Sequence, residues 1–166
     1  MLTIQNTLLA GAAVTTALIA GLLYAYACSV NPGLNRLPDA GYLAAMQSIN
    51  RAILNPVFFI AFLGAPILLP LSTWMHYGYP TTYRFWFLLG AATVYLIGVL
   101  GVTALGNIPL NEALDSVNIQ AASPEEIAHQ RNAFEGPWNK WHMIRTASSV
   151  LSLVLVIIAC LNPKTE

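Results

Sequence analysis

Long stretches of this sequence carry no charged residue. None of Asp, Glu, Lys or Arg occurs before Arg36 or between Arg51 and Arg84. A helix needs about 20 predominantly apolar residues to cross the hydrocarbon core of a bilayer, and both stretches are longer than that. Because backbone polar groups in lipid must find their hydrogen-bond partners within the segment itself, each stretch is expected to cross a membrane as a helix.

Four such crossings are predicted, over about residues 8–30, 56–74, 85–105 and 137–161. The whole chain, 1–166, is then expected to be one all-α domain, an integral membrane four-helix bundle with short helices in its loops. Composition agrees with this, since 57% of the residues are hydrophobic and only 8% are charged, against about 25% charged in a typical soluble domain. An even number of crossings predicts a multi-pass protein with both termini on the same side of the lipid bilayer.

The charge distribution limits the kinds of partner that the protein can bind and predicts its orientation in the membrane. The formal net charge is zero and no basic run is present, so no nucleic acid partner is expected. The two long loops, residues 31–55 and 107–136, fall on the side opposite the termini, which we call the loop side. Five of the seven cations lie on or near it, and the positive-inside rule then predicts that it is cytoplasmic. These five are Arg36, Arg51, Arg131, Lys140 and Arg145.

Local signals predict where the helices begin, bend and end. A short helix is expected around residues 43–51 of the first loop, and Asn55-Pro56 is a start signal for the second crossing. Pro66 and Pro70 are expected to bend that crossing. Gly106-Asn107 before a proline predicts the end of the third crossing. Ser123-Pro124-Glu125-Glu126 predicts the start of a separate short helix that ends near residue 134.

A polar stripe in the fourth crossing is the most informative pattern for function. Trp138, His142, Arg145, Ser149 and Ser152 follow one another at spacings of 4, 3, 4 and 3, which places them on one helix face. An ionisable residue within a membrane span is costly and is expected to face the bundle interior. The alternative is structural: the arginine extends to the interface, the tryptophan belongs to an interfacial belt and the serines serve helix packing. The spacing leaves both readings open.

An inward Arg145 needs hydrogen-bond acceptors, and Asn107, Asn111, Glu112 or a loop carbonyl on the same side are the expected ones. Tyr24 is expected to face the stripe from the first crossing. The three histidines carry no metal-site spacing, since His76 falls on the opposite side from His129 and His142. No metal and no other cofactor is therefore expected, and no phosphate-binding or nucleophile-elbow motif is present.

Several short motifs together resemble the anthrone oxygenase-like family of small four-helix membrane proteins. Two patterns of the second half are the most specific in combination, Asn-x-Pro-x-Asn from Asn107 to Asn111 and Trp-x-x-x-His-x-x-Arg from Trp138 to Arg145. The first half contributes the runs at residues 31–34, 45–51 and 55–58. The resemblance covers nearly the whole chain and implies the four-helix membrane fold. Its fungal members oxidise anthrones, which are tricyclic phenols, to anthraquinones with dioxygen.

That resemblance leads to a hypothesis for the site. His142, whose ordinary pKa lies near neutrality, is the expected base, and Arg145 with Asn111 is expected to stabilise an oxyanion. The partner is a small apolar aromatic substrate of anthrone or quinone type, and the residues expected to bind it are Tyr24, Asn50, Asn55, Asn107 and Trp138. The alternative is a non-enzymatic membrane bundle or an accessory subunit of a larger complex. A homo-oligomer or a partner subunit in the membrane is compatible with either reading.

Overall fold

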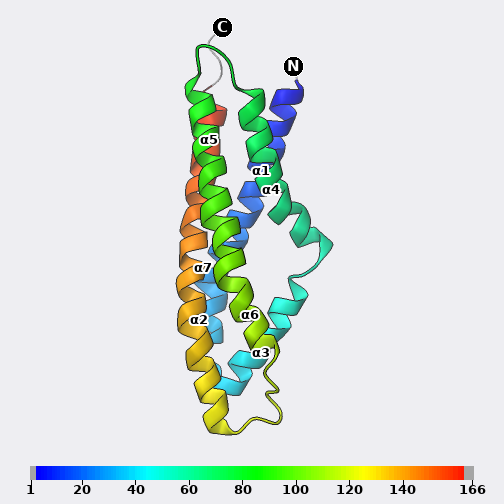
Figure 1. Cartoon of the computed structure of the whole chain (residues 1–166), viewed down its shortest axis with the longest axis vertical. Helices are drawn as coiled ribbons and strands as arrows, with labels where there is room; N and C mark the ends of the chain where they lie inside the picture. Colours follow the sequence, from blue (N-terminus) through cyan, green and yellow to red (C-terminus); the bar gives the residue numbers. More distant parts are fainter. Residues whose placement is uncertain (1–2, 163–166) are drawn as a thin grey trace.

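A computed structural model describes residues 3–162 of the chain. Four helical segments are long and apolar enough to cross a membrane: Ile4–Leu34, Pro56–Met75, Tyr83–Asp115 and Pro124–Leu161. They run side by side along the long axis of the molecule (Figure 1). The predicted class is therefore confirmed: the protein is an all-α, multi-pass integral membrane protein.

The first and third segments are helices with π-helical turns inserted in them. The first consists of α1 (Ile4–Ala25), the π turn η1 (Tyr26–Val30) and α2 (Asn31–Leu34). The third consists of α5 (Tyr83–Tyr95), the π turns η2 (Leu96–Gly101) and η3 (Thr103–Asn107), and α6 (Ile108–Asp115). The second and fourth are α4 (Pro56–Met75) and α7 (Pro124–Leu161), and α3 (Asp39–Ala52) lies in the first loop.

Side-chain caps explain why several of these helices begin where they do. Asn55 accepts a hydrogen bond from the Phe58 amide at 3.0 Å and so caps α4, with Pro56 in the first turn, as the sequence predicts. Ser123 and Glu126 form a reciprocal capping box at the start of α7. The helix predicted around residues 43–51 is confirmed as part of α3. Figure 1 shows that α4, which contains Pro66 and Pro70, changes direction along its length.

Two helix ends predicted from sequence are wrong. The third segment continues through Gly106 and Pro109, because the π turn η3 leads directly into α6, which carries Pro109 in its first turn. Gly106 serves close packing instead, since a Cβ added there would lie 2.6 Å from the Trp141 ring. The helix that begins at Ser123 also does not end near residue 134 but continues through Pro137. Pro137 lies on an exposed face of α7, where its ring meets no neighbouring helix.

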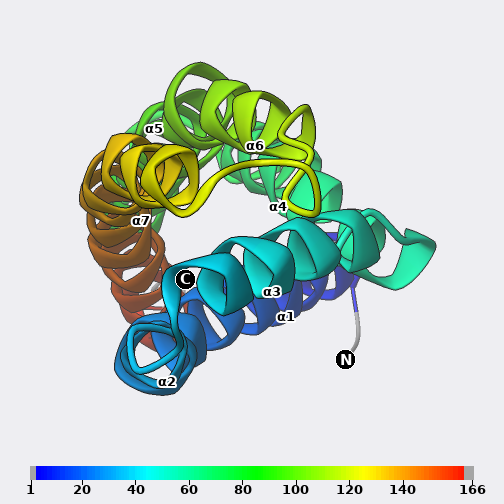
Figure 2. The ribbon, with the colours of Figure 1, turned by 90° about the horizontal axis from the view of Figure 1, so that it is seen from below.

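The interior is divided into two apolar clusters along the long axis. The larger one joins the four crossing segments and contains residues such as Ile19, Leu69 and Tyr95. The smaller one joins α3 to the loop-side half of α7 and to α6, and it contains Tyr42, Met46 and Phe134. We call the part of the molecule around the smaller cluster the cap. Figure 2 shows α3 crossing the end of the bundle in front of α1.

Arg131 of α7 fastens the beginning of α3 to α7 within the cap. Its guanidinium donates to Asp39 at 2.9 Å, to Glu135 at 2.7 Å and to the Leu37 carbonyl at 2.9 Å. It also lies over the Tyr42 ring, 4.5 Å from the centroid. Burial, followed by the nearby Glu135 carboxylate, raises the pKa of the Tyr42 phenol, so this ring stays uncharged.

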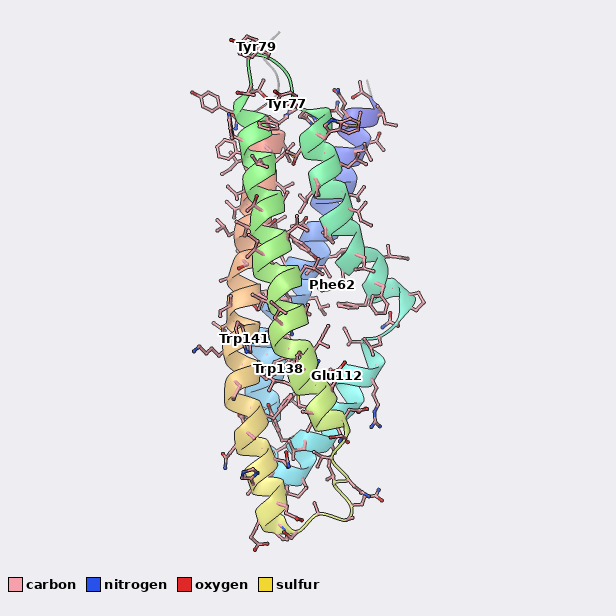
Figure 3. The ribbon with its side chains drawn as sticks, viewed as in Figure 1. Phe62, Tyr77, Tyr79, Glu112, Trp138 and Trp141 are labelled. Carbon is pink, nitrogen blue, oxygen red and sulfur yellow. The ribbon has the colours of Figure 1, made fainter. Side chains whose placement is uncertain are left out.

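The beginning of α1 and the end of α7 lie at the same end of the bundle (Figure 1). Gln5 donates to the Met75 carbonyl at 3.1 Å, and Arg84 donates to the Ala159 carbonyl at 3.0 Å, so the four helix ends there are joined in pairs. Figure 3 places Tyr77 and Tyr79 at this end, both of them exposed. Aromatic side chains of this kind are typical of a membrane–water interface.

Candidate functional site

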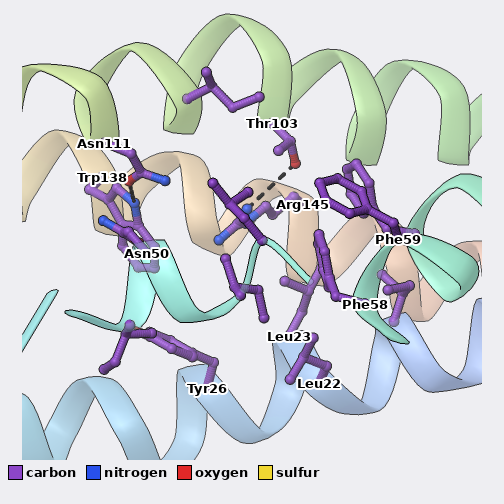
Figure 4. Close-up of a pocket in the computed structure, with 16 residues that line it drawn as sticks. Leu22, Leu23, Tyr26, Asn50, Phe58, Phe59, Thr103, Asn111, Trp138 and Arg145 are labelled. Carbon is purple, nitrogen blue, oxygen red and sulfur yellow. Dashed lines mark hydrogen bonds between the residues drawn. The ribbon is translucent and has the colours of Figure 1, made fainter. Parts of the chain in front are cut away.

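A cavity of about 150 Å³ lies where the larger apolar cluster meets the cap. Most of its wall is apolar and comes from α1, α3 and α4, with Ile19, Leu23, Phe58 and Phe62 among its residues. Its polar wall comes from α3, the third segment and α7 (Figure 4). The polar groups are Asn50, Thr103, Asn111 and Arg145, with the amphipathic rings of Tyr26 and Trp138 beside them. No carboxylate contributes to the lining.

Arg145 is the one formally charged side chain in this wall. Its Nε donates to His142 Nδ1 at 3.2 Å, and its Nη1 lies 3.5 Å from the Thr103 hydroxyl. Its guanidinium carbon lies 5.3 Å from the centre of the Trp138 ring. Within residues 3–162 no Asp or Glu forms an ion pair with it. The expected acceptors Asn107, Asn111 and Glu112 are wrong, and His142 and Thr103 take their place.

His142 is fully buried and lies behind Arg145 rather than in the cavity wall. Its ring stacks on Trp138 with centroids 5.0 Å apart and meets the Tyr26 ring edge-on at 5.4 Å. A guanidinium offers only donors, so Nδ1 must be the acceptor and the ring proton is assigned to Nε2, 3.4 Å from Thr146 Oγ1. The ring is therefore a neutral imidazole whose free lone pair holds the guanidinium.

Trp138 is held in place by two asparagines of the third segment. Its indole N–H donates to Asn111 Oδ1 at 2.8 Å, and its backbone carbonyl accepts from Asn107 Nδ2 at 3.3 Å. Asn107 is fully buried and its Oδ1 has no partner among the described residues. The two asparagines thus fix the ring against which Arg145 and His142 pack.

Two of the π turns lie beside the cavity. Tyr26 is the first residue of η1 and Thr103 the first residue of η3, and both line the wall. A π turn is a local widening of the helix, and such turns are frequent at functional sites. The Tyr26 hydroxyl donates to Met46 Sδ at 3.3 Å, which links the wall to the cap.

The cavity opens at the corner between α3 and α4. Leu54, Phe59 and Ile108 line it and are also substantially exposed on the outside, Leu54 to 65%. Exposed apolar side chains at this corner continue with Val57 and Ile60. In Figure 1 the first half of α4 diverges from α5 and α6 at this level. The mouth is therefore apolar and lies on the side of the bundle.

The structure brings four of the eight residues predicted from sequence into the cavity wall, namely Asn50, Asn111, Trp138 and Arg145. The other four lie elsewhere. His142 and Asn107 are buried behind the wall, and Asn55 caps α4. Tyr24 is 61% exposed on the outer face of α1, because that face points away from the bundle.

Sequence reasoning missed the residue of the first segment that does face the stripe. Tyr26 continues the buried face of Thr16, Ile19 and Leu23, at helical spacing. Almost every residue of this segment is apolar, so periodicity could not distinguish that face from the one that carries Tyr24. The phenylalanines of α4 were missed for the same reason. A cluster of His, Cys, Asp and Glu that could hold a metal ion is absent from the described part of the chain.

Comparison with known proteins gives one match. The sequence model of the family described as anthrone oxygenase matches residues 3–155. No curated protein and no solved structure matches the chain.

Proposed function

The chain belongs to the anthrone oxygenase family, and from that premise we propose that it oxidises a flat apolar aromatic substrate of anthrone or quinone type with dioxygen, inside the membrane. The observation that carries the proposal is a guanidinium without a carboxylate partner in the wall of an apolar cavity. A charge in such a place is costly unless an anion or a set of acceptors meets it. We propose that the substrate supplies that anion.

An anthrone has an acidic CH₂ group opposite its ring carbonyl. Loss of one proton gives an anion whose charge is shared with the carbonyl oxygen. The ring carbon of that anion reacts with dioxygen to form a carbon–oxygen bond, and loss of water from the resulting hydroperoxide leaves a second carbonyl. One anthrone and one dioxygen thus give one anthraquinone and one water. Stabilising the anion is the step that a fixed cation in an apolar cavity promotes.

Arg145 is the group we assign to the oxyanion, with Asn111 as a further donor. Trp138, Tyr26 and the phenylalanines of α4 offer flat apolar surfaces for the ring system. A closed cavity of this size holds roughly one aromatic ring, so part of a three-ring substrate would extend into the mouth beside Leu54 and Phe59. Such a substrate partitions into lipid, and the apolar mouth suits entry from the bilayer. We also propose the membrane orientation predicted from sequence, with both termini on one side and the loop side in the cytoplasm.

His142 takes a different role in this proposal from the base expected on sequence grounds. Its Nδ1 lone pair already accepts the Arg145 hydrogen bonds, and its ring is shielded from the cavity. We propose that His142 is a positioning residue that aims the guanidinium at the substrate. With the anion stabilised by Arg145, water that reaches the cavity can accept the substrate proton.

Turnover of an anthrone by the protein in lipid nanodiscs tests the function. We expect dioxygen consumption and quinone formation in a ratio of one to one, faster than in empty nanodiscs. Arg145→Gln should lower the rate by about 100-fold or more, the range for loss of an oxyanion stabiliser. Ser152→Ala, on the same stripe but bonded to the Ala91 carbonyl away from the cavity, is the matched control and should keep most of the rate. A rate equal to that of empty nanodiscs contradicts the proposal.

A pair of substitutions at His142 separates positioning from proton transfer. In His142→Asn the amide oxygen occupies the place of Nδ1 and can still accept from Arg145, but it cannot take a proton. We expect His142→Asn to keep most of the rate and His142→Ala to lose it. Equal loss in both variants, with the fold intact, would instead make His142 the base.

A further inference from the structure

The Arg145 guanidinium has N–H groups that the protein does not use. Of its five N–H donors, those on Nε and Nη2 share one acceptor, His142 Nδ1, at 3.2 and 3.1 Å. A third, on Nη1, faces the Thr103 hydroxyl at 3.5 Å. One N–H remains on each terminal nitrogen, and Figure 4 shows the guanidinium among the lining residues, between Trp138 and Phe58. A carboxylate, with its two oxygens side by side, is the group that accepts from two such donors at once.

This cation can be reached by an anion in the cavity. Arg145 is only partly buried, whereas His142 behind it is fully buried. The lining contains no carboxylate that would repel an anion, and no Asp or Glu of residues 3–162 pairs with the guanidinium. A charge in an apolar wall is costly unless an opposite charge meets it. The opposite charge must therefore come from a molecule other than this chain.

The size of the cavity limits how much of that molecule it can hold. A volume of about 150 Å³ takes roughly six non-hydrogen atoms, as many as one benzene ring, which is a carboxyl group with about three methylenes. The rest of the molecule must leave through the mouth, where Leu54 and Phe59 line the cavity and are also exposed outside. Because the mouth is apolar, the part that passes through it must be apolar as well.

The mouth lies at the depth where the carboxylate of a fatty acid resides in a bilayer. It is beside the first turn of α4, which has 20 residues and is therefore about 30 Å long, the thickness of the hydrocarbon core. The mouth is thus at the loop-side edge of that core. A fatty acid keeps its charged carboxylate at this edge and its chain in the core, because an ionised group is costly in hydrocarbon.

We propose that the cavity also binds free fatty acids, with the carboxylate on Arg145 and the acyl chain leaving through the mouth into the bilayer. A fatty acid bound in this way covers the cation that the proposed reaction uses for the substrate oxyanion. It therefore inhibits oxidation of the aromatic substrate by competition, and free fatty acid in the membrane regulates the site. Only the inhibition rests on the proposed function, because the binding depends on the cavity alone.

Binding of radiolabelled dodecanoate to the protein in phosphatidylcholine nanodiscs tests the proposal, at a mildly alkaline pH that ionises the acid and with uptake by empty nanodiscs subtracted. We expect one saturable site in the wild-type protein. Arg145→Met should weaken it about tenfold or more, the worth of a hydrogen bond to a charged group. Arg51→Gln, which removes an exposed loop-side cation outside the cavity lining, is the matched control and should keep the wild-type affinity.

Two competing ligands test the wild-type protein without any substitution, which matters if Arg145→Met does not fold. Dodecanol has the same chain without the charge and should not displace the label at concentrations at which unlabelled dodecanoate does. Acetate has the charge without the chain and should displace it only at far higher concentration. Displacement by dodecanol as effective as that by dodecanoate overturns the role of the cation. Acetate as effective as dodecanoate overturns entry from the bilayer.

The remaining outcomes separate this proposal from the proposed function. No saturable binding of dodecanoate, or equal affinity in wild type and Arg145→Met, overturns the fatty-acid site but leaves the oxidation of an anthrone standing. When anthrone is turned over, dodecanoate should raise KM and leave kcat unchanged, and binding without inhibition overturns the competition. A wild-type protein that binds dodecanoate but oxidises no anthrone overturns the proposed function and leaves the fatty-acid site standing.

Discussion

Close packing of the third and fourth segments can be tested at Gly98. This glycine of η2 faces Ser148 of α7, and a Cβ added there would lie 2.6 Å from the Ser148 Cβ and in still closer contact with its Oγ. The Cβ of a serine cannot move without its backbone. Since carbon atoms prefer separations of about 3.5–4.0 Å, Gly98→Ala must push α7 and η2 apart by roughly 1 Å.

The expected loss in the free energy of unfolding is obtained by comparing Gly98 with a glycine that has free space around it. Overpacking a close contact costs about 1–3 kcal/mol, while Gly→Ala within a helix gains about 1 kcal/mol. At Gly136 of α7 and Gly21 of α1 nothing lies within 4 Å of the added Cβ, so only the gain applies there. The free energy of unfolding of Gly98→Ala should therefore fall below that of Gly136→Ala by about 1–3 kcal/mol.

Reversible unfolding in mixed detergent micelles, followed by circular dichroism, measures this difference. Ser148→Gly added to Gly98→Ala should restore most of the lost stability, because it removes the atoms that clash. A Gly98→Ala protein as stable as Gly136→Ala would refute the packing described for these segments. The position of Thr103 next to Arg145 would then be wrong as well, because these two residues lie in the same pair of segments.

Further predictions concern the elements that hold the cavity. Arg131→Met should loosen the attachment of α3, costing about 1–3 kcal/mol because the pair is only partly buried, and hydrogen exchange should show faster opening of α3 than of α7. Asn55→Ala should lower the free energy of unfolding by about 1 kcal/mol through loss of the α4 cap and leave turnover unchanged. Asn55→Asp should keep the cap. Equal stability of the wild type, Asn55→Ala and Asn55→Asp would contradict the role of the Asn55 side chain as the cap of α4.

The sequence predicts the crossings well because their physics is local. The absence of charge over a long run and the need to bond the backbone in lipid are read directly from residues before Arg36 and between Arg51 and Arg84. The inward direction of Arg145 follows from the cost of a charge in lipid. Asn55 as a cap likewise depends only on its immediate neighbours.

The site was predicted less well because it depends on helix phase and on packing between distant segments. The first segment is apolar on all sides, so the sequence does not tell whether Tyr24 or Tyr26 lies on its buried face. The adjacent Thr15 and Thr16 do not help, because neighbouring residues lie on different faces of a helix. A glycine before a proline reads as a helix end, yet Gly106 is needed for the approach of Trp141. Arg145 and His142 are in contact, yet Arg145 lies in the cavity wall and His142 is buried behind it. Their spacing in the sequence does not reveal this difference.

The central claim is that Arg145 stabilises the anion of a bound aromatic ketone. Spectroscopic titration of anthrone in the protein under strictly anaerobic conditions tests it directly, because the anion absorbs at longer wavelength and cannot react onward. We predict that bound anthrone ionises at a pH at least about one unit lower than in empty nanodiscs, equivalent to about 1.4 kcal/mol, and that Arg145→Gln removes this shift. An ionisation midpoint that is the same in the wild-type protein, in Arg145→Gln and in empty nanodiscs would contradict the account.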